Sequence, residues 1–270
     1  MTLVQKEIKA VYLWENKVRP SIQPITTAWI YRNETDGLIS LSSDGSTWIT
    51  IADKNLWATT VYNSWDTMSE SNCGKFYQRW NNYWFPFTWP TTTSTTQVNA
   101  RYYWPNNYYS SSTFIKWANY QSSWDSSTNK NLRWWVTWTV TAMKWPCPSW
   151  FHVMSVDESD TLLLKRASIR WVTAEVIGNW HRITNSTDIS NFLSDIKMPL
   201  CWSISWSGSK STASWLWTST YTASYSIYVV WLATSQITAK YNGDTSPNGE
   251  AIRPFKNEAV QPDDSRTKLY

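Results

Sequence analysis

Tryptophan is more than three times as frequent as glycine in this chain, and the imbalance limits what the chain can fold into. The 270 residues include 23 Trp and 7 Gly, whereas glycine ordinarily makes up about 7% of residues. Turns often need a positive φ, which glycine adopts at little steric cost and a bulky side chain does not. Many of the tryptophans nevertheless stand beside Asn, Asp, Ser or Pro, as turn residues do; these are Trp65, Trp84, Trp89, Trp104, Trp145, Trp150, Trp180 and Trp206.

We therefore hypothesise that many of these positions are glycine in the protein. Some bacteria and phages read the codon UGA as glycine, and a table that reads UGA as tryptophan would print Trp there. Trp48 and Trp217 lie in strand-like contexts, and we expect both to be genuine tryptophans. The alternative is a chain that is truly rich in tryptophan.

Charge and hydropathy restrict the classes of partner. The formal charge of +4 comes from 24 basic and 20 acidic residues, and no Lys/Arg stripe indicates a nucleic-acid surface. No apolar run is long enough to span a membrane, and Met1 to Lys9 does not read as a signal peptide. We expect a virion or cell-surface location if the protein is carried on a particle, and a cytoplasmic one otherwise.

The hydrophobic pattern predicts an α+β domain with short strands, two main helices and long loops. Ser155 and Glu158 form a capping box before a helix over 155–167, whose buried face would be Leu162 to Leu164. A second helix is predicted over 188–196 and a short one within 69–78. Strands are predicted over 38–41, 48–51, 227–230 and 251–255, with a hairpin turn at Gly45.

Three segments follow from this pattern. Residues 1–30 form a leader for attachment, with Pro20 and Pro24 in a linker, and could assemble the chain as a homo-oligomer. Residues 31–256 form the main domain, and 257–270 a polar tail. Residues 80–130 read as a long polar and aromatic loop region.

Five segments in order resemble the Fibrobacter succinogenes major paralogous domain, once Trp57 and Trp150 are read as glycine. They are Asp53-Lys54-Asn55-Leu56-Trp57-Ala58, Cys73-Gly74-Lys75-Phe76-Tyr77-Gln78, Cys147-Pro148-Ser149-Trp150-Phe151-His152-Val153, Leu216-Trp217-Thr218-Ser219-Thr220 and Ala251-Ile252-Arg253-Pro254-Phe255-Lys256. The similarity covers about residues 31–260. Met154, Ser159 and Pro254 depart from the family pattern, which has Pro, Trp and Cys there. Arg79, Arg133 and Arg266 stand where related sequences have Trp, as if an arginine codon were also reassigned.

The resemblance implies a C-type-lectin-like fold. The same broad fold occurs in formylglycine-generating enzymes and in hypervariable receptor-binding proteins of phages and bacteria. From this resemblance we expect a non-catalytic domain that binds a protein or glycan on a cell surface and has no cofactor. The alternatives are a structural particle protein and, less favoured, an enzyme of the formylglycine-generating type, whose paired late cysteines this chain lacks. Calcium is compatible with lectin-like loops, but no acidic loop cluster indicates it, and no other metal is expected.

The cysteines and histidines leave alternatives open. Cys73, Cys147 and Cys201 fit no zinc spacing, and one disulfide with a free thiol or three free thiols are both compatible. The resemblance implies that Cys73 and Cys147 either pair or remain buried thiols. It places His152 and Trp217 in structural motifs, so we expect His152 to hydrogen-bond in the core rather than to act in a catalytic triad. His181 is expected to be exposed.

Tyrosines set among Ser, Thr and Asn are the best functional signal. Tyr supplies rigid contact area and Ser and Asn supply adaptable hydrogen bonds, a mixture that binding loops favour. The candidate ligand-binding residues are Tyr102, Tyr103, Tyr108, Tyr109, Tyr221, Tyr225 and Tyr228. The alternative is that some of these tyrosines fill a core.

Overall fold

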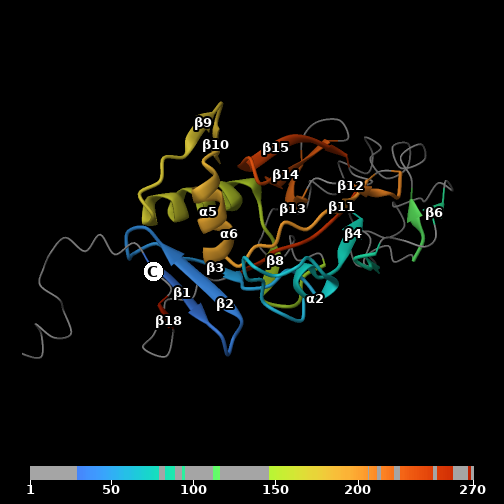
Figure 1. Ribbon diagram of the computed structural model, residues 1–270, viewed down its shortest axis with the longest axis horizontal. Coiled ribbons are helices and arrows are strands. Elements are labelled where there is room, and N and C mark those ends of the chain that lie inside the picture. The colour runs from blue at the N-terminus through green and yellow to red at the C-terminus, as the bar shows by residue number, and fades with distance from the viewer. Residues whose placement is uncertain are drawn as a thin grey trace, which may run out of the picture.

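The structure is a computed structural model. It describes residues 29–78, 83–88, 93–94, 112–115, 146–205, 207–211, 214–221, 226–245, 248–257 and 267–268. The leader predicted over 1–30 lies outside these residues, except for 29 and 30, which begin the first strand. Within them, short antiparallel strands and three helices confirm the α+β class (Figure 1).

A six-stranded antiparallel sheet joins the first described strand to the last. Its order is β18-β1-β2-β3-β17-β8. Its strands are β1 (Trp29–Asn33), β2 (Leu38–Ser42), β3 (Ile49–Ala52), β8 (Phe151–Val153), β17 (Pro254–Lys256) and β18 (Thr267–Lys268). The pairing of β18 with β1 places Lys268 opposite Tyr31, so part of the predicted polar tail is a strand of this sheet. The predicted strand over 251–255 is shorter, because only 254 and 255 of it lie in β17.

Two five-stranded sheets and one two-stranded pair contain the other described strands. One has the order β13-β14-β15-β10-β9, with β9 (Glu175–Ile177), β10 (Trp180–Ile183), β13 (Ser214–Tyr221), β14 (Ser226–Leu232) and β15 (Ile237–Thr245). The other has the order β12-β11-β16-β4-β5, with β4 (Phe76–Gln78), β5 (Trp84–Phe85), β11 (Ser203–Ile204), β12 (Lys210–Ser211) and β16 (Gly249–Glu250). A parallel pair joins β6 (Thr93–Ser94) to β7 (Phe114–Ile115).

The two predicted helices are present, and each begins at the expected kind of cap. In α5 (Val156–Ile169), the Ser155 hydroxyl accepts from Glu158 N at 3.1 Å and the Glu158 carboxylate accepts from Ser155 N at 2.6 Å. In α6 (Ser186–Asp195), the side chain of Asn185 accepts from two backbone amides. Leu164 is 37% exposed, so its predicted place on the buried face was wrong; successive helical residues point about 100° apart.

The short predicted helix is shorter than expected. It forms α2 (Glu70–Cys73) and then gives way to β4. Gly74, with a φ of +77°, ends the helix, and a Cβ built there would lie 2.3 Å from Leu56 O. Glycine at this position therefore allows two backbone segments to approach each other.

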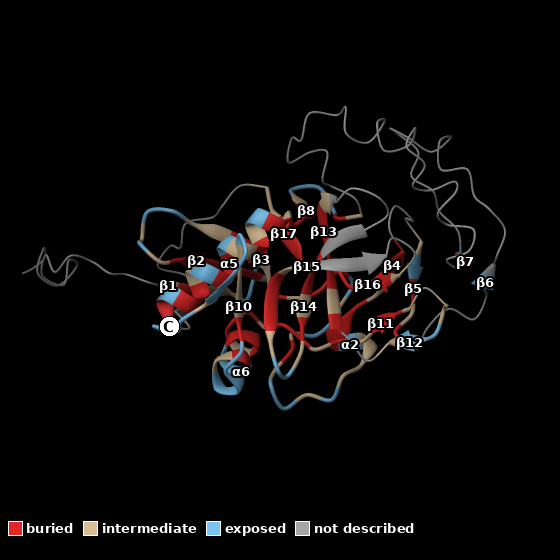
Figure 2. Ribbon diagram, turned by 90° about the horizontal axis from the view of Figure 1, so that it is seen from above, coloured by how far each residue is buried: buried red, intermediate tan, exposed pale blue. Residues whose placement is uncertain are grey.

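The core lies between the sheets, with α5 packed against both the six-stranded sheet and the sheet that contains β15 (Figures 1 and 2). One cluster of buried apolar residues includes Ile39, Leu163, Phe192 and Cys201. A second cluster gathers around Trp217, with Leu56, Tyr77 and Cys147. An ion pair inside the helical layer, Arg166 with Asp195, links α5 to α6 at 2.8 Å.

The disulfide joins Cys73 to Cys201 rather than to Cys147. The Cα atoms of Cys73 and Cys201 lie 5.7 Å apart, whereas Cys147 is a buried free thiol. Of the alternatives left open, one disulfide with one free thiol is confirmed, whereas a pairing of Cys73 with Cys147 is wrong. The physical reason is that Cys73 and Cys201 share the first core cluster, while Cys147 lies in the second.

Burial also raises the pKa of the Cys147 thiol, because the apolar surroundings disfavour the thiolate. We expect iodoacetamide to leave Cys147 unmodified in the native protein. After unfolding without reductant, peptide mapping should find label at Cys147 alone and a linked peptide that contains Cys73 and Cys201. Label at Cys201 in the unreduced protein would contradict this pairing.

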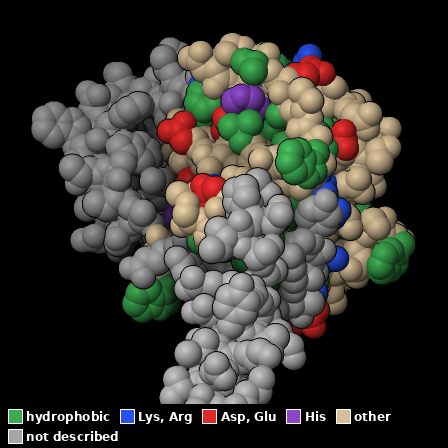
Figure 3. Space-filling model, turned by 90° about the vertical axis from the view of Figure 1, so that its left-hand side faces the viewer, with side chains coloured by type: hydrophobic (Ala, Val, Ile, Leu, Met, Phe, Trp, Pro, Cys, Tyr) green, Lys and Arg blue, Asp and Glu red, His purple; other side chains and the backbone are tan. Residues whose placement is uncertain are grey.

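The described part of the chain contains no helix that is long and apolar enough to cross a bilayer. On the face drawn in Figure 3, the coloured Lys and Arg side chains lie close to acidic and polar groups.

Candidate functional site

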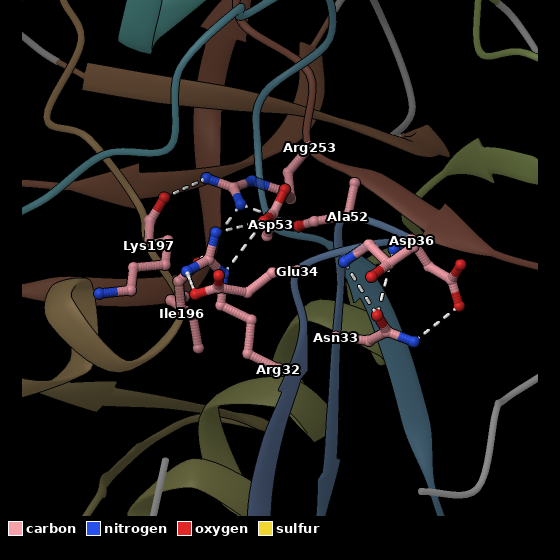
Figure 4. Close-up of polar contacts among 10 residues, drawn as sticks. Arg32, Asn33, Glu34, Asp36, Ala52, Asp53, Ile196, Lys197 and Arg253 are labelled. Atoms are coloured by element: carbon pink, nitrogen blue, oxygen red, sulfur yellow. Dashed lines mark hydrogen bonds and ion pairs between the residues drawn. The ribbon is translucent and has the colours of Figure 1, made fainter. Parts of the chain in front are cut away.

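The first and fifth motif segments meet at the buried guanidinium of Arg253, which Figure 4 shows near Ala52, Asp53 and Lys197. Its Nε donates to Asn55 Oδ1 at 3.0 Å, its Nη1 to Ala52 O at 2.9 Å and its Nη2 to Lys197 O at 2.7 Å. Arg253 is fully buried. Burial lowers its pKa to about 9, partly opposed by the charge of Asp53. The first and fifth motif segments are therefore held together by one side chain.

Hydrogen bonds to backbone carbonyls connect the second and fourth motif segments to the same region. Asn55 Nδ2 donates to Cys73 O at 3.1 Å, and Leu56 N donates to Ile252 O at 2.8 Å. Trp217 is 1% exposed, and its indole N–H donates to Tyr77 O at 2.6 Å. These contacts explain why the chain needs Trp217 as a tryptophan: the ring fills the second core cluster and its polar edge has a fixed partner.

His152 is buried, as expected, and both ring nitrogens have partners. Nε2 lies 2.8 Å from Glu158 Oε1, and Nδ1 lies 3.1 Å from Asn257 Oδ1. Burial would raise the pKa of the Glu158 carboxyl, but hydrogen bonds from His152 and Ser155 outweigh it and hold that pKa below its ordinary value. The histidine thus connects the start of α5 to the segment after β17.

His181 is less exposed than predicted. It lies in β10 with 23% of its side chain exposed, and its Nδ1 is 2.9 Å from Asp160 Oδ2. The same carboxylate accepts from His181 N through Oδ1 at 2.9 Å. Asp160 therefore fixes the position of the β10 strand against α5.

Two of the candidate tyrosines lie on neighbouring strands. Tyr221 ends β13 and pairs with Ile227, which is next to Tyr228 in β14. The backbone thus brings Tyr221 and Tyr228 to the same end of the β13–β14 pair. The remaining candidates, Tyr102, Tyr103, Tyr108, Tyr109 and Tyr225, lie outside the described residues.

A cavity of about 490 Å³ lies beside the Arg253 region. Its walls come from the β1–β2 turn, the segment after β3, the segment before β8, and Pro254. Part of its lining is apolar and rigid, with Leu56, Phe151 and three prolines: Pro146, Pro148 and Pro254. The charged lining residues among those described are Glu34, Asp36, Asp53 and Lys54. Sequence reasoning missed this cavity, because its walls come from segments more than 100 residues apart.

Three tryptophans have backbone conformations that favour glycine. φ is +64° at Trp57, +72° at Trp150 and +57° at Trp171, and their side chains are 63%, 71% and 83% exposed. Trp57 and Trp150 were singled out from their sequence contexts, whereas Trp171 was not. The other described positions suspected from context, Trp65, Trp84 and Trp180, do not have a positive φ.

Among the residues that the structure describes, no group of three or more His, Cys, Asp or Glu side chains is placed to hold a metal ion. Searches of protein-family models, of curated proteins and of solved structures each found no match to this chain. The function must therefore be argued from the geometry.

Proposed function

We propose that this chain is a non-catalytic ligand-binding domain with a C-type-lectin-like fold, displaying a tyrosine-rich surface to a protein or glycan on a cell. The observation that carries the proposal is that motif residues are buried in the scaffold and hydrogen-bonded there. Arg253, Trp217 and His152 are buried and hydrogen-bonded to neighbouring segments. Such residues support loops rather than perform chemistry, and binding residues are typically carried on loops over a rigid scaffold.

The arrangement of Tyr221 and Tyr228 adds support. Their strands β13 and β14 pair with each other, so the backbone brings both residues to one end of this strand pair. A phage tail fibre or a bacterial surface structure would be a suitable carrier for such a domain, attached through the leader.

The test is binding of the labelled full chain to a glycan array and to whole bacterial cells. We expect the double variant Tyr221→Ala, Tyr225→Ala to lose at least about tenfold in binding, because aromatic residues dominate interface energies. Its circular dichroism and thermal unfolding should stay unchanged. Tyr31→Ala, in β1 of the other sheet, is the control and should retain binding.

Two outcomes would contradict the proposal. If the double variant binds like the parent chain, the listed tyrosines are not the site. If the purified protein instead oxidises a cysteine-containing peptide, the chain is an enzyme of the formylglycine-generating type.

A further inference from the structure

The cavity beside Arg253 contains a buried carboxylate oxygen without a partner. Asp53 is 1% exposed, and its Oδ2 accepts from Arg32 Nε at 3.1 Å and from Arg32 Nη2 at 2.9 Å (Figure 4). Asp53 Oδ1 has no hydrogen-bond partner. An unsatisfied buried acceptor is unfavourable, so a donor that reached this oxygen would be stabilised.

The free oxygen is covered by protein atoms and lies beside Gly37. A Cβ built on Gly37 would be 3.3 Å from Asp53 Oδ1, and both Gly37 and Asp53 line the cavity. Because residue 37 has no side chain, no Cβ lies against this oxygen on that side. Arg253 does not donate to Asp53 Oδ1, because its N–H groups donate to Asn55 and to backbone carbonyls.

The turn between β1 and β2 adds two more carboxylates to the lining of the cavity. Glu34 and Asp36 are both exposed lining residues. Arg32 is shared between two carboxylates, because its Nη1 also lies 2.8 Å from Glu34 Oε1. Phe151 and the three prolines, which also line the cavity, offer apolar surface to an alkyl chain.

We propose that this cavity binds the side chain of a lysine or arginine from a partner polypeptide. The methylene groups would pack against Phe151 and the prolines, as the stems of these side chains commonly do. The cationic head would donate to Asp53 Oδ1 and face Glu34 and Asp36, since charge-assisted hydrogen bonds are stronger than neutral ones. The cavity volume lies within the range of ligand pockets, about 300–1,000 Å³. The proposed binding mode does not involve the ring of Trp57, which also lines the cavity.

The experiment is a titration followed by two-dimensional NMR of the amide groups of the full chain. The probes are the N-acetyl amides of arginine and lysine, each paired with a neutral analogue of similar shape, citrulline for arginine and norleucine for lysine. We expect millimolar binding of the cationic probes to shift the amides of Gly37, Asp53 and Lys54. The neutral analogues should bind several-fold more weakly, and added salt should weaken the binding of the cations.

Two variants test whether the carboxylates of Glu34 and Asp36 contribute to the binding of the cationic probe. Glu34→Gln together with Asp36→Asn should weaken the binding of the arginine probe roughly three- to tenfold, as expected for two exposed carboxylates. Glu175→Gln is the matched control, because Glu175 is also an exposed carboxylate paired with an arginine, 2.7 Å from Arg182 Nε. It should leave the binding of the probe unchanged. The amide spectra also report whether each variant is folded.

Equal binding of norleucine and lysine probes would overturn the proposal and make the cavity an apolar site. Absence of shifts at Gly37 and Asp53 would overturn it as well. The assignment does not rest on the tyrosine surface. The Tyr221→Ala, Tyr225→Ala variant should still bind the arginine probe, so failure of one site is distinguishable from failure of the other.

Discussion

Replacing Arg253 by methionine is expected to lower the free energy of unfolding by about 3 kcal/mol or more, because it leaves three acceptors without their donor and each unsatisfied buried acceptor costs about 1–3 kcal/mol. Methionine keeps much of the volume of the side chain but none of its donors. Asn55 Oδ1 and the carbonyls of Ala52 and Lys197 would then lose the donors that they have in the native structure. Whole domains are stable by only about 5–15 kcal/mol, so this single change should bring the chain close to unfolding.

Urea unfolding of two further variants separates geometry from charge. Arg253→Lys retains a cation but not the planar fork of donors, and we expect it to recover only part of the loss. Arg182→Met removes a half-exposed arginine whose Nε lies 2.7 Å from Glu175, and surface pairs of this kind contribute about 0–1 kcal/mol. If Arg253→Met costs no more than Arg182→Met, the motif segments are not held together by Arg253.

The features that could be predicted from the sequence are those that depend on neighbouring residues. The capping box at Ser155 and Glu158 requires only four consecutive residues, and the structure has α5 beginning there. The buried state of His152 followed from its motif. The strand over 227–230 is contained in β14, because its run of apolar residues suits a buried strand.

The features that could not be predicted depend on contacts across the chain. Nothing near Cys73 distinguishes Cys201, which is 128 residues away, from Cys147 as its partner. The cavity likewise requires that Glu34 and Pro254 be brought to the same place. The role of Arg253 was equally hidden, since a lone arginine near the end of a chain is most often a solvated side chain.

The positive φ angles at three tryptophans coincide with turns that require such an angle. Ala58 N donates to Asn55 O at 3.0 Å, and Phe151 N donates to Pro148 O at 3.1 Å. Trp57 and Trp150 are thus the third residues of two four-residue turns, the position at which type II turns need a positive φ and usually carry Gly.

Trp171 follows the end of α5 in the same kind of conformation. Val172 N donates to Ala167 O at 2.9 Å and Trp171 N donates to Ser168 O at 3.2 Å, the hydrogen-bond pattern of a helix end that glycine most often completes. Three separate local geometries therefore favour glycine where the chain has Trp. We infer that positions 57, 150 and 171 are glycine in the protein as its native host makes it.

A variant with Trp57→Gly, Trp150→Gly and Trp171→Gly is therefore expected to be more stable than the chain with tryptophan. In the folded chain, the left-handed conformation costs a residue with a side chain about 1–2 kcal/mol. Glycine removes this cost, but its greater freedom in the unfolded chain lowers stability by about 0.4–1 kcal/mol. The net gain is about 1 kcal/mol per site, which for a chain of this length raises Tm by roughly 6–12 °C in total. The gain should be smallest at Trp57, whose side chain hydrogen-bonds to Tyr77.

The matched control is Trp65→Gly, because Trp65 is 82% exposed, like Trp171 at 83%, but lacks the positive φ. Trp171→Gly should raise Tm, while Trp65→Gly should leave it unchanged or lower it, since there glycine relieves no backbone strain and only adds freedom to the unfolded chain. Equal shifts from the two changes would show that exposure of the ring, not backbone strain, sets the effect.

Peptide mass spectrometry of the protein from its native source then reads positions 57, 150 and 171 directly. Tryptophan at all three would refute the recoding and, with it, the motif similarity on which the lectin-like assignment depends.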